Sequence, residues 1–118
     1  MAKIVQVINA MITNEKDISN VIENNEEYYF LYNQSHKWSI RKKPEDDEDG
    51  YSIHYYPDKD DTLEGLASTK DWLSKKYVTY KSQDIKTREA DETFRELYQL
   101  VSNKIYGIDD IFNEIIKG

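Results

Sequence analysis

The chain has 118 residues, no cysteine, ten tyrosines and a formal net charge of −7. This length is typical of one domain, so we expect a single globular domain over residues 1–118. The composition excludes disulfides and thiolate metal sites, and no apolar run approaches the roughly 20 residues that span a bilayer, so we expect a cytoplasmic protein.

The first apolar segment, residues 3–12, predicts a helix. Ile4, Ile8 and Met11 recur at helical spacing, although a strand over residues 4–8 competes because branched side chains favour it. Ile18, Val21 and Ile22 continue the helical spacing, which predicts helix up to about Asn24. One long bent helix and two short helices both fit this pattern.

Three tyrosine-rich runs follow, and they predict strands over residues 28–32, 37–43 and 51–56. The first run is apolar on both faces, which indicates a strand that is central or covered on both sides. The other two alternate between apolar and polar residues. Two hairpins in succession predict an antiparallel meander with one dry face and one polar face that carries tyrosine hydroxyls.

After a loop over residues 58–61, Asp61 or Thr62 can cap a short helix. Residues 77–80 predict a fourth strand, and pairing of this strand beside the first run would explain why that run is apolar on both faces. The inner side of the short helix is predicted to consist of apolar side chains: Leu63, Leu66, Ala67 and Leu73.

The clearest helix begins after the candidate cap Thr87 and ends at Gly107, which can adopt the left-handed conformation. Asp109 is a candidate cap for a last short helix, whose apolar side chains we expect inside the fold: Ile111, Phe112, Ile115 and Ile116. The predicted class is therefore α+β. A three- to four-stranded antiparallel sheet lies under an N-terminal helix, a long C-terminal helix and a short terminal helix.

The negative charge is concentrated in one window. From Glu45 to Glu64 there are nine acidic residues and one basic residue, a charge of −8, while the remaining residues sum to +1. This predicts one negative edge that contacts another molecule. The predicted partner-binding residues are Glu45, Asp46, Asp47, Glu48, Asp49, Asp58, Asp60, Asp61 and Tyr56.

We expect no metal site in the acidic block. Taking Gly50 as the sixth position of a calcium loop puts Tyr56 at the twelfth position, which requires a bidentate carboxylate. A solvated hairpin tip, partly neutralised by residues 41–43, fits the block better. His36 and His54 are both expected at the surface, in a turn and on the polar face of a strand.

A metal-dependent hydrolase is an alternative, because Asp58, Asp84 and Lys86 match the loose spacing of the PD-(D/E)xK nucleases. This short pattern arises easily in a chain rich in Asp and Lys, and an acidic edge repels nucleic acid. The predicted hydrolase site is therefore the weaker interpretation.

No motif in the chain indicates catalysis or a cofactor, so the leading hypothesis is a small acidic protein that binds another protein. Its partner has a basic groove or patch, as in phage or immunity inhibitors that mimic nucleic acid. A further alternative is a small-ligand or peptide module on the tyrosine-bearing face of the sheet. The tyrosines that either fill core edges or form such a surface are Tyr29, Tyr56, Tyr77 and Tyr80.

Overall fold

The computed structural model describes residues 2–42 and 50–117, and its class is α+β, as predicted. A five-stranded antiparallel sheet in the order β1-β2-β3-β4-β5 replaces the three to four strands expected. The strands are β1 (Ile18–Asn24), β2 (Glu27–Tyr32), β3 (His36–Lys42), β4 (Tyr51–Tyr56) and β5 (Val78–Lys81). The helices are α1 (Lys3–Thr13), α2 (Leu63–Ser68), α3 (Ser82–Ile85), α4 (Arg88–Tyr106) and α5 (Ile108–Lys117), with 3₁₀ turns at η1 (Glu15–Asp17) and η2 (Trp72–Ser74).

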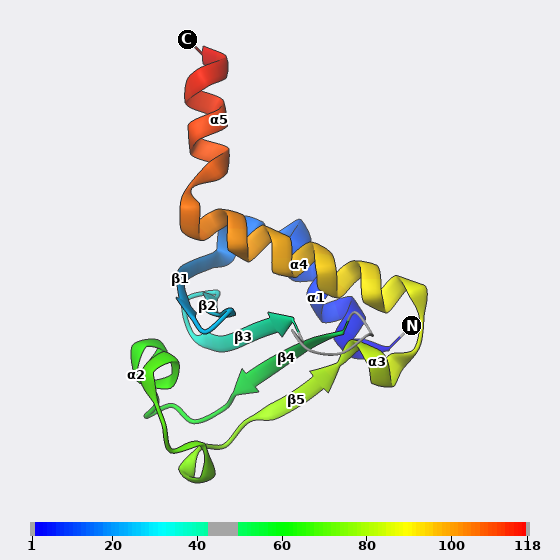
Figure 1. The fold of residues 1–118 in the computed structure, drawn as a ribbon, viewed down its shortest axis with the longest axis vertical. Helices are drawn as coiled ribbons and strands as arrows, with labels where there is room; N and C mark the ends of the chain where they lie inside the picture. The colour runs from blue at the N-terminus through cyan, green and yellow to red at the C-terminus, as the bar shows by residue number, and fades with distance from the viewer. Residues whose placement is uncertain (1, 43–49, 118) are drawn as a thin grey trace.

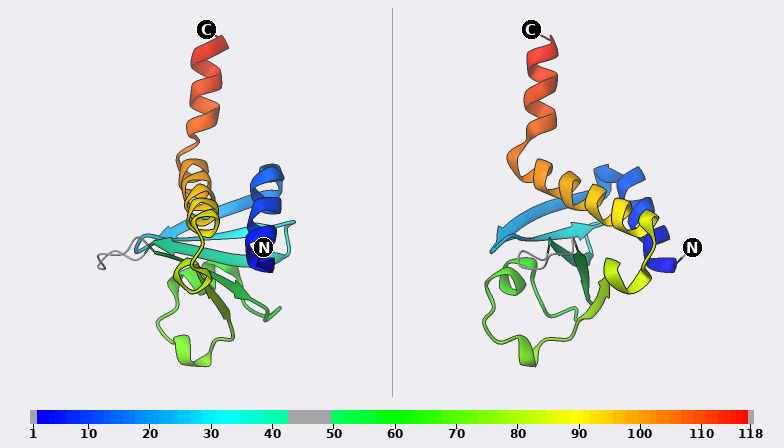
Figure 2. Two further views of the ribbon diagram at one scale, coloured as in Figure 1. Left: turned by 90° about the vertical axis from the view of Figure 1, so that its right-hand side faces the viewer. Right: turned by 45° about the vertical axis from the view of Figure 1, so that its right-hand side comes forward.

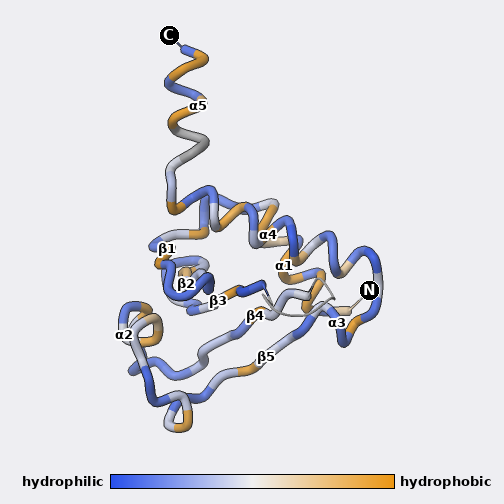
Figure 3. Tube along the Cα trace, in the orientation of Figure 1, coloured by the Kyte–Doolittle hydropathy of each residue, from blue (hydrophilic) through white to orange (hydrophobic). Residues whose placement is uncertain are grey.

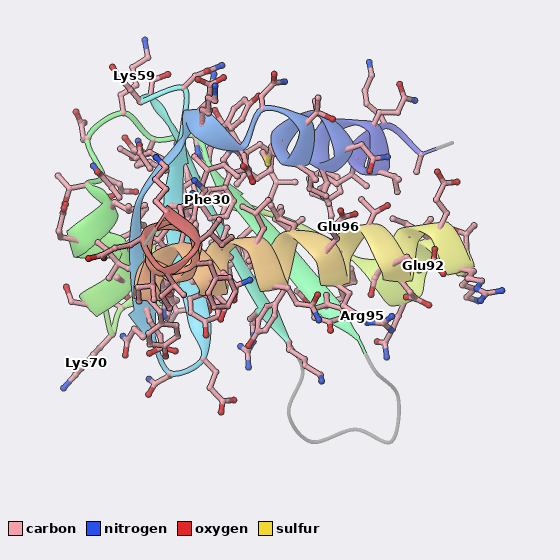
Figure 4. The ribbon with its side chains drawn as sticks, turned by 90° about the horizontal axis from the view of Figure 1, so that it is seen from above. Phe30, Lys59, Lys70, Glu92, Arg95 and Glu96 are labelled. Atoms are coloured by element: carbon pink, nitrogen blue, oxygen red, sulfur yellow. The ribbon has the colours of Figure 1, made fainter. Side chains whose placement is uncertain are left out.

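Helices cover the two faces of the sheet unequally. Helices α1 and α4 lie on one face, and the short helix α2 lies beside the other (Figures 1 and 2). Seen from above, α4 runs beside α1, and Glu92, Arg95 and Glu96 project from it into solvent (Figure 4). Phe30 of β2 is fully buried beneath these helices. The larger core is thus formed by α1, α4 and one face of the sheet.

Strand β2 has the central position that its two apolar faces predicted. It pairs with β1 on one side and β3 on the other. Tyr28 and Phe30 join the core under α1 and α4, whereas Tyr29 joins the smaller core under α2, with Leu31 packed against it. The two faces of β2 are therefore buried by different elements, one by α1 and α4 and the other by α2.

The predicted helix over residues 18–24 is wrong, because this segment is strand β1. A bulge between Ser19 and Ile22 adds a residue to the strand, and Asn20 has a φ of 57° there. The extra residue gives apolar positions a spacing of three and four without any helix. At the predicted helix end, Asn25 and Glu26 instead form a two-residue hairpin turn, and both have positive φ.

The last predicted strand exists, but it does not take the place beside the first run that would have explained the two apolar faces of that run. Strand β5 pairs with β4, so that Tyr55 faces Val78 and Ser52 faces Lys81. The place beside β2 belongs to β1 instead. Because every strand pairs with its neighbour in the chain, β1 and β5 are the two edges of the sheet.

The predicted caps of α2 and α4 are confirmed, whereas the predicted cap Asp109 is wrong, because α5 begins one residue earlier, at Ile108. The Thr62 and Thr87 side chains accept hydrogen bonds from the backbone N–H groups of Gly65 and Ala90, at 3.0 and 3.1 Å. Gly107 ends α4 with a φ of 63°. The prediction that Leu73 faces inward is wrong, because its side chain is 101% exposed.

Helix α5 exists, but the predicted burial of its apolar side is wrong. It extends away from the sheet and the other helices beyond its junction with α4 (Figure 1). Apolar and polar residues alternate along it, as the hydropathy colouring shows (Figure 3). The exposed fractions are 45% for Ile111, 56% for Phe112, 71% for Ile115 and 81% for Ile116.

Among the described residues, no helix is both long and apolar enough to cross a membrane.

Candidate functional site

A connected group of polar side chains lies on the sheet face beside α2. Strand pairing places Ser39 of β3 between Tyr29 of β2 and His54 of β4. The Ser39 hydroxyl donates a hydrogen bond to Glu27 Oε2 at 2.5 Å, and it lies 2.7 Å from the Tyr56 hydroxyl oxygen. Ser39 is fully buried. The buried hydroxyls of Ser39 and Tyr56 are therefore satisfied by each other and by the partly buried Glu27 carboxylate.

His54 is the second titratable group of this network. Its Nδ1 lies 2.8 Å from Thr79 Oγ1 on the edge strand, and its Nε2 lies 3.8 Å from Glu27 Oε2. Burial lowers the pKa of His54, and this outweighs the nearby Glu27 carboxylate, which acts in the opposite direction. His54 is therefore neutral at pH 7. Its contact with Glu27 is too long for a hydrogen bond and carries no ion pair.

Two buried tyrosines complete the network. Burial raises the pKa of Tyr29, and the Glu27 carboxylate raises it further. The pKa of Tyr56 is also raised, again mainly by burial, although the hydrogen bond with Ser39 acts in the opposite direction. Both hydroxyls therefore remain protonated across the physiological range, as hydrogen-bond donors rather than phenolates.

A cavity of about 270 Å³ opens beside this network. Glu27, Arg41 and His54 provide its polar lining, and three aromatic side chains, Tyr56, Trp72 and Tyr77, provide the rest. The ring centroids of these aromatic residues lie 5.9 to 6.1 Å apart in each pair. The cavity therefore combines a carboxylate, a guanidinium and an aromatic wall.

The network contains a serine, a histidine and a carboxylate, but their contacts differ from those of a nucleophilic triad. In a triad the histidine contacts the nucleophile and the carboxylate orients the histidine. Here Ser39 bonds directly to Glu27, and His54 bonds to Thr79. Ser39 is also completely buried, so its hydroxyl is not accessible for nucleophilic attack.

The predicted acidic edge is only partly within the described chain. The block Glu45–Asp49 lies outside the described residues, so its predicted contact with a partner stays a prediction. Of the others, Asp60 is exposed, and Asp58 accepts a hydrogen bond from the Asp60 backbone N–H at 2.9 Å. Asp61 bonds to Lys75 at 2.8 Å, and this bond raises the pKa of Lys75. Asp61 is therefore engaged within the chain.

Asp58 and the point where the described chain resumes lie at opposite ends of β4. Gly50 is the first described residue after the gap, and Tyr51, the first residue of β4, pairs with Lys42. Asp58 lies two residues beyond Tyr56, the last residue of this six-residue strand. Such a strand is about 20 Å long, so Gly50 and Asp58 are well separated.

The predicted hydrolase residues are not brought together. Asp58 lies beyond one end of the β4-β5 ladder, whereas Asp84 is in α3, beyond the other end. Lys86 follows α3 with a left-handed backbone. Within residues 2–42 and 50–117, no group of three or more histidine, aspartate and glutamate side chains is placed to hold a metal ion.

The remaining candidates divide between core and surface. Tyr29 and Tyr56 are buried, while Tyr77 and Tyr80 are 44% and 40% exposed. His36 is exposed, as predicted, and its Nδ1 lies 3.2 Å from the Tyr55 hydroxyl.

His54 was also expected at the surface and is instead partly buried among Glu27, Thr79 and Tyr77. The positions of Glu27, Arg41 and Trp72 at the cavity were not predicted either. Glu27 and Arg41 are directly opposite each other in the sheet, a relation that appears only once the register is known.

No family model, curated protein or solved structure matches this chain.

Proposed function

We propose that this chain is a binding protein rather than an enzyme, and that it engages another protein through helix α5. The observation that carries this proposal is the exposure of four large apolar side chains on a helix that the rest of the fold leaves uncovered: Ile111, Phe112, Ile115 and Ile116. An amphipathic helix whose apolar side lies in a partner's groove is a common mode of protein recognition.

The free energy available from burying these four side chains supports the presence of a binding partner. Burying one side chain of this kind contributes about 1.5–3 kcal/mol relative to leaving it exposed. Four such side chains on one helix exceed the scattered apolar exposure that is ordinary on a protein surface. Docking α5 in a groove therefore supplies a free energy that the isolated chain does not obtain.

The acidic window suggests the chemistry around that groove. Its charge of −8 favours a partner with basic residues near the contact, as on a nucleic-acid-binding enzyme. The protein is then an inhibitor of the phage or bacterial kind, acting in the cytoplasm as a competitor for a polyanion site. Long-range attraction raises the association rate and weakens with salt.

The test is a capture experiment with tagged chain and lysate of the cells that encode it. Replacing Ile115 and Ile116 by Gln removes apolar surface while keeping a good helix former and the net charge. We expect this double variant to lose the proteins that the wild type captures. Leu73→Gln is the matched control, because Leu73 is fully exposed outside α5.

Two further results decide the proposal. A variant with Asn or Gln at positions 45–49 should capture less of the same partner, and the difference should disappear at high salt. If the α5 double variant captures the same proteins as the wild type in the same amounts, α5 is not the contact element and the proposal fails.

The cavity on the polar face supports a second candidate, a small-ligand module. Its volume of about 270 Å³ is slightly below the 300–1,000 Å³ typical of ligand pockets, so it suits an amino-acid-sized ligand or one side chain of a peptide. Glu27 can accept bonds from an ammonium group, Arg41 can donate to a carboxylate, and Trp72 can pack against an apolar part.

A panel of free amino acids and small amines, followed by NMR of the amide signals, tests this candidate. Shifts confined to residues around Trp72 and Tyr77, and lost in Glu27→Gln, would support it. Trp72→Ala should weaken binding as well. A panel that leaves all these signals unchanged at millimolar concentration would count against the cavity as a ligand site.

A further inference from the structure

An apolar groove runs between α1 and the edge of the sheet, on the face opposite the polar cavity. Its volume is about 520 Å³, within the range of established binding pockets. Its lining includes six apolar or aromatic residues: Val7 and Ala10 of α1, Trp38 of β3, Tyr55 of β4, and Val78 and Tyr80 of β5. The described residues of its lining also include Asn33, His36 and Lys3, and Lys3 brings a positive charge.

The groove exists because the helical layer stops short of the sheet edge. Helix α1 buries Ile4, Ile8 and Met11, but Ala10 on the same helix remains exposed. On edge strand β5, Val78 and Tyr80 are 45% and 40% exposed. An apolar strip is therefore left open beside α1, on the face that α1 and α4 cover elsewhere.

We propose that α5 of one copy docks in this groove of a second copy, and that α5 of the second copy docks in the groove of the first. This inference rests on one part of the proposed function, the use of α5 as the contact element, and goes beyond it by giving α5 a second copy of this chain as partner, distinct from the basic protein. The docked helix lies beside α1 as a third member of the helical layer. Val78 and Tyr80 then pack against the apolar side of α5.

Both halves of the contact occur on one chain, which argues for self-association. A reciprocal exchange closes with twofold symmetry, so the same contact forms twice and neither half remains unused. Within one copy the exchange is hindered, because one residue, Gly107, joins α4 to α5, and α5 points away from the body (Figure 1). Exchange between copies keeps that junction unchanged.

Charge separates this partner from the basic one. Each copy carries −7, so two copies repel each other, and salt screens that repulsion. The groove itself contributes little charge, and the contact is apolar. Self-association should therefore strengthen with salt, whereas binding to a basic protein should weaken.

Sedimentation equilibrium of the full chain is the first experiment. With rising concentration, the mass should move from 14.0 kDa toward twice that value, and more readily at high salt. A wild type that remains a monomer up to about 1 mM at both low and high salt would overturn the inference. The capture experiment with α5 variants would still test the broader proposal in that case.

Variants of the two halves give the sharper test. Ile115→Gln with Ile116→Gln removes the donor surface, and Ala10→Arg obstructs the groove on a helical residue that is exposed in the monomer. Each should weaken self-association about tenfold or more. The matched controls are Leu73→Gln for lost apolar surface and Thr13→Arg for added charge on the same helix, and both should associate as the wild type does.

Mixing the two defective variants distinguishes helix-in-groove docking from pairing of α5 with α5. The Ala10→Arg chain retains its α5, and the α5 double variant retains its groove, so their mixture has one intact contact and should form a heterodimer. Pairing between α5 helices predicts normal dimers of Ala10→Arg alone and no gain on mixing. That outcome would overturn the groove as the docking site. Circular dichroism of each variant checks that the fold is retained.

Discussion

The two faces of the sheet differ in what covers them and in what they can do. One face is packed by α1 and α4 over a continuous apolar core that includes Phe30, Phe94 and Leu97. The other is covered at one end by α2 and carries Ser39 and His54 in a polar network beside a cavity. The first face provides most of the apolar packing. The second face has buried and partly buried polar groups. The predictions below test that division.

The largest effect is expected on the packed face. Leu97→Ala removes a fully buried side chain of α4 and should reduce the free energy of unfolding by about 2–5 kcal/mol. Urea denaturation measures the loss. Ile115→Ala makes the same kind of truncation on exposed α5 and should cost less than about 0.5 kcal/mol at low protein concentration. Equal losses would show that α5 is packed in solution.

A smaller effect is expected at the centre of the polar face. Ser39→Ala removes the hydroxyl that contacts Glu27 and Tyr56 and leaves both without that partner. The expected loss is about 1–3 kcal/mol, the usual cost of an unsatisfied buried polar group. Thermal and urea denaturation should agree on it. Ser35→Ala, in an exposed turn, is the control. If both variants lose the same free energy of unfolding, the network does not contribute specifically to stability.

The smallest effect depends on pH. The pKa of His54 is lowered in the folded protein, so the unfolded chain binds a proton more readily below about pH 6.5. His54 therefore contributes a loss of stability as the pH falls from 7 toward 5. His54→Gln should show a shallower decline in melting temperature over this range. If it declines as steeply as wild type, the polar face is more solvated than the structure indicates.

Local patterns in the sequence were sufficient for much of the packed face. The apolar run 28–32 and the alternating runs 37–43 and 51–56 placed three strands and their order, because the side-chain pattern along a strand is a local property. The caps Thr87 and Gly107 bounded α4 for the same reason. These features depend on a few neighbouring residues and not on the rest of the chain.

Features that depend on distant partners could not be predicted in this way. Because of the bulge at Asn20, the apolar residues of strand β1 have the spacing of a helix. The bulge becomes apparent only from the pairing of β1 with β2. Periodicity in α5 shows that one side is apolar but not what covers it. Glu27 and Trp72 both line the polar cavity although they are 45 positions apart in the sequence. Their proximity follows from the pairing register of the strands and from the position of η2.

The junction at Gly107 has a consequence for the thermodynamics of any docking event. The backbone N–H of Gly107 donates to the carbonyls of Asn103 and Lys104, and its own carbonyl accepts a hydrogen bond from the Ile111 N–H. The two helices are therefore joined at one backbone position that is hydrogen-bonded on both sides, without a linker. Because α5 is already helical in the structure, docking it does not require the loss of entropy that forming a helix costs. The helix is held ready in advance, and more of the free energy of its contacts remains available as affinity.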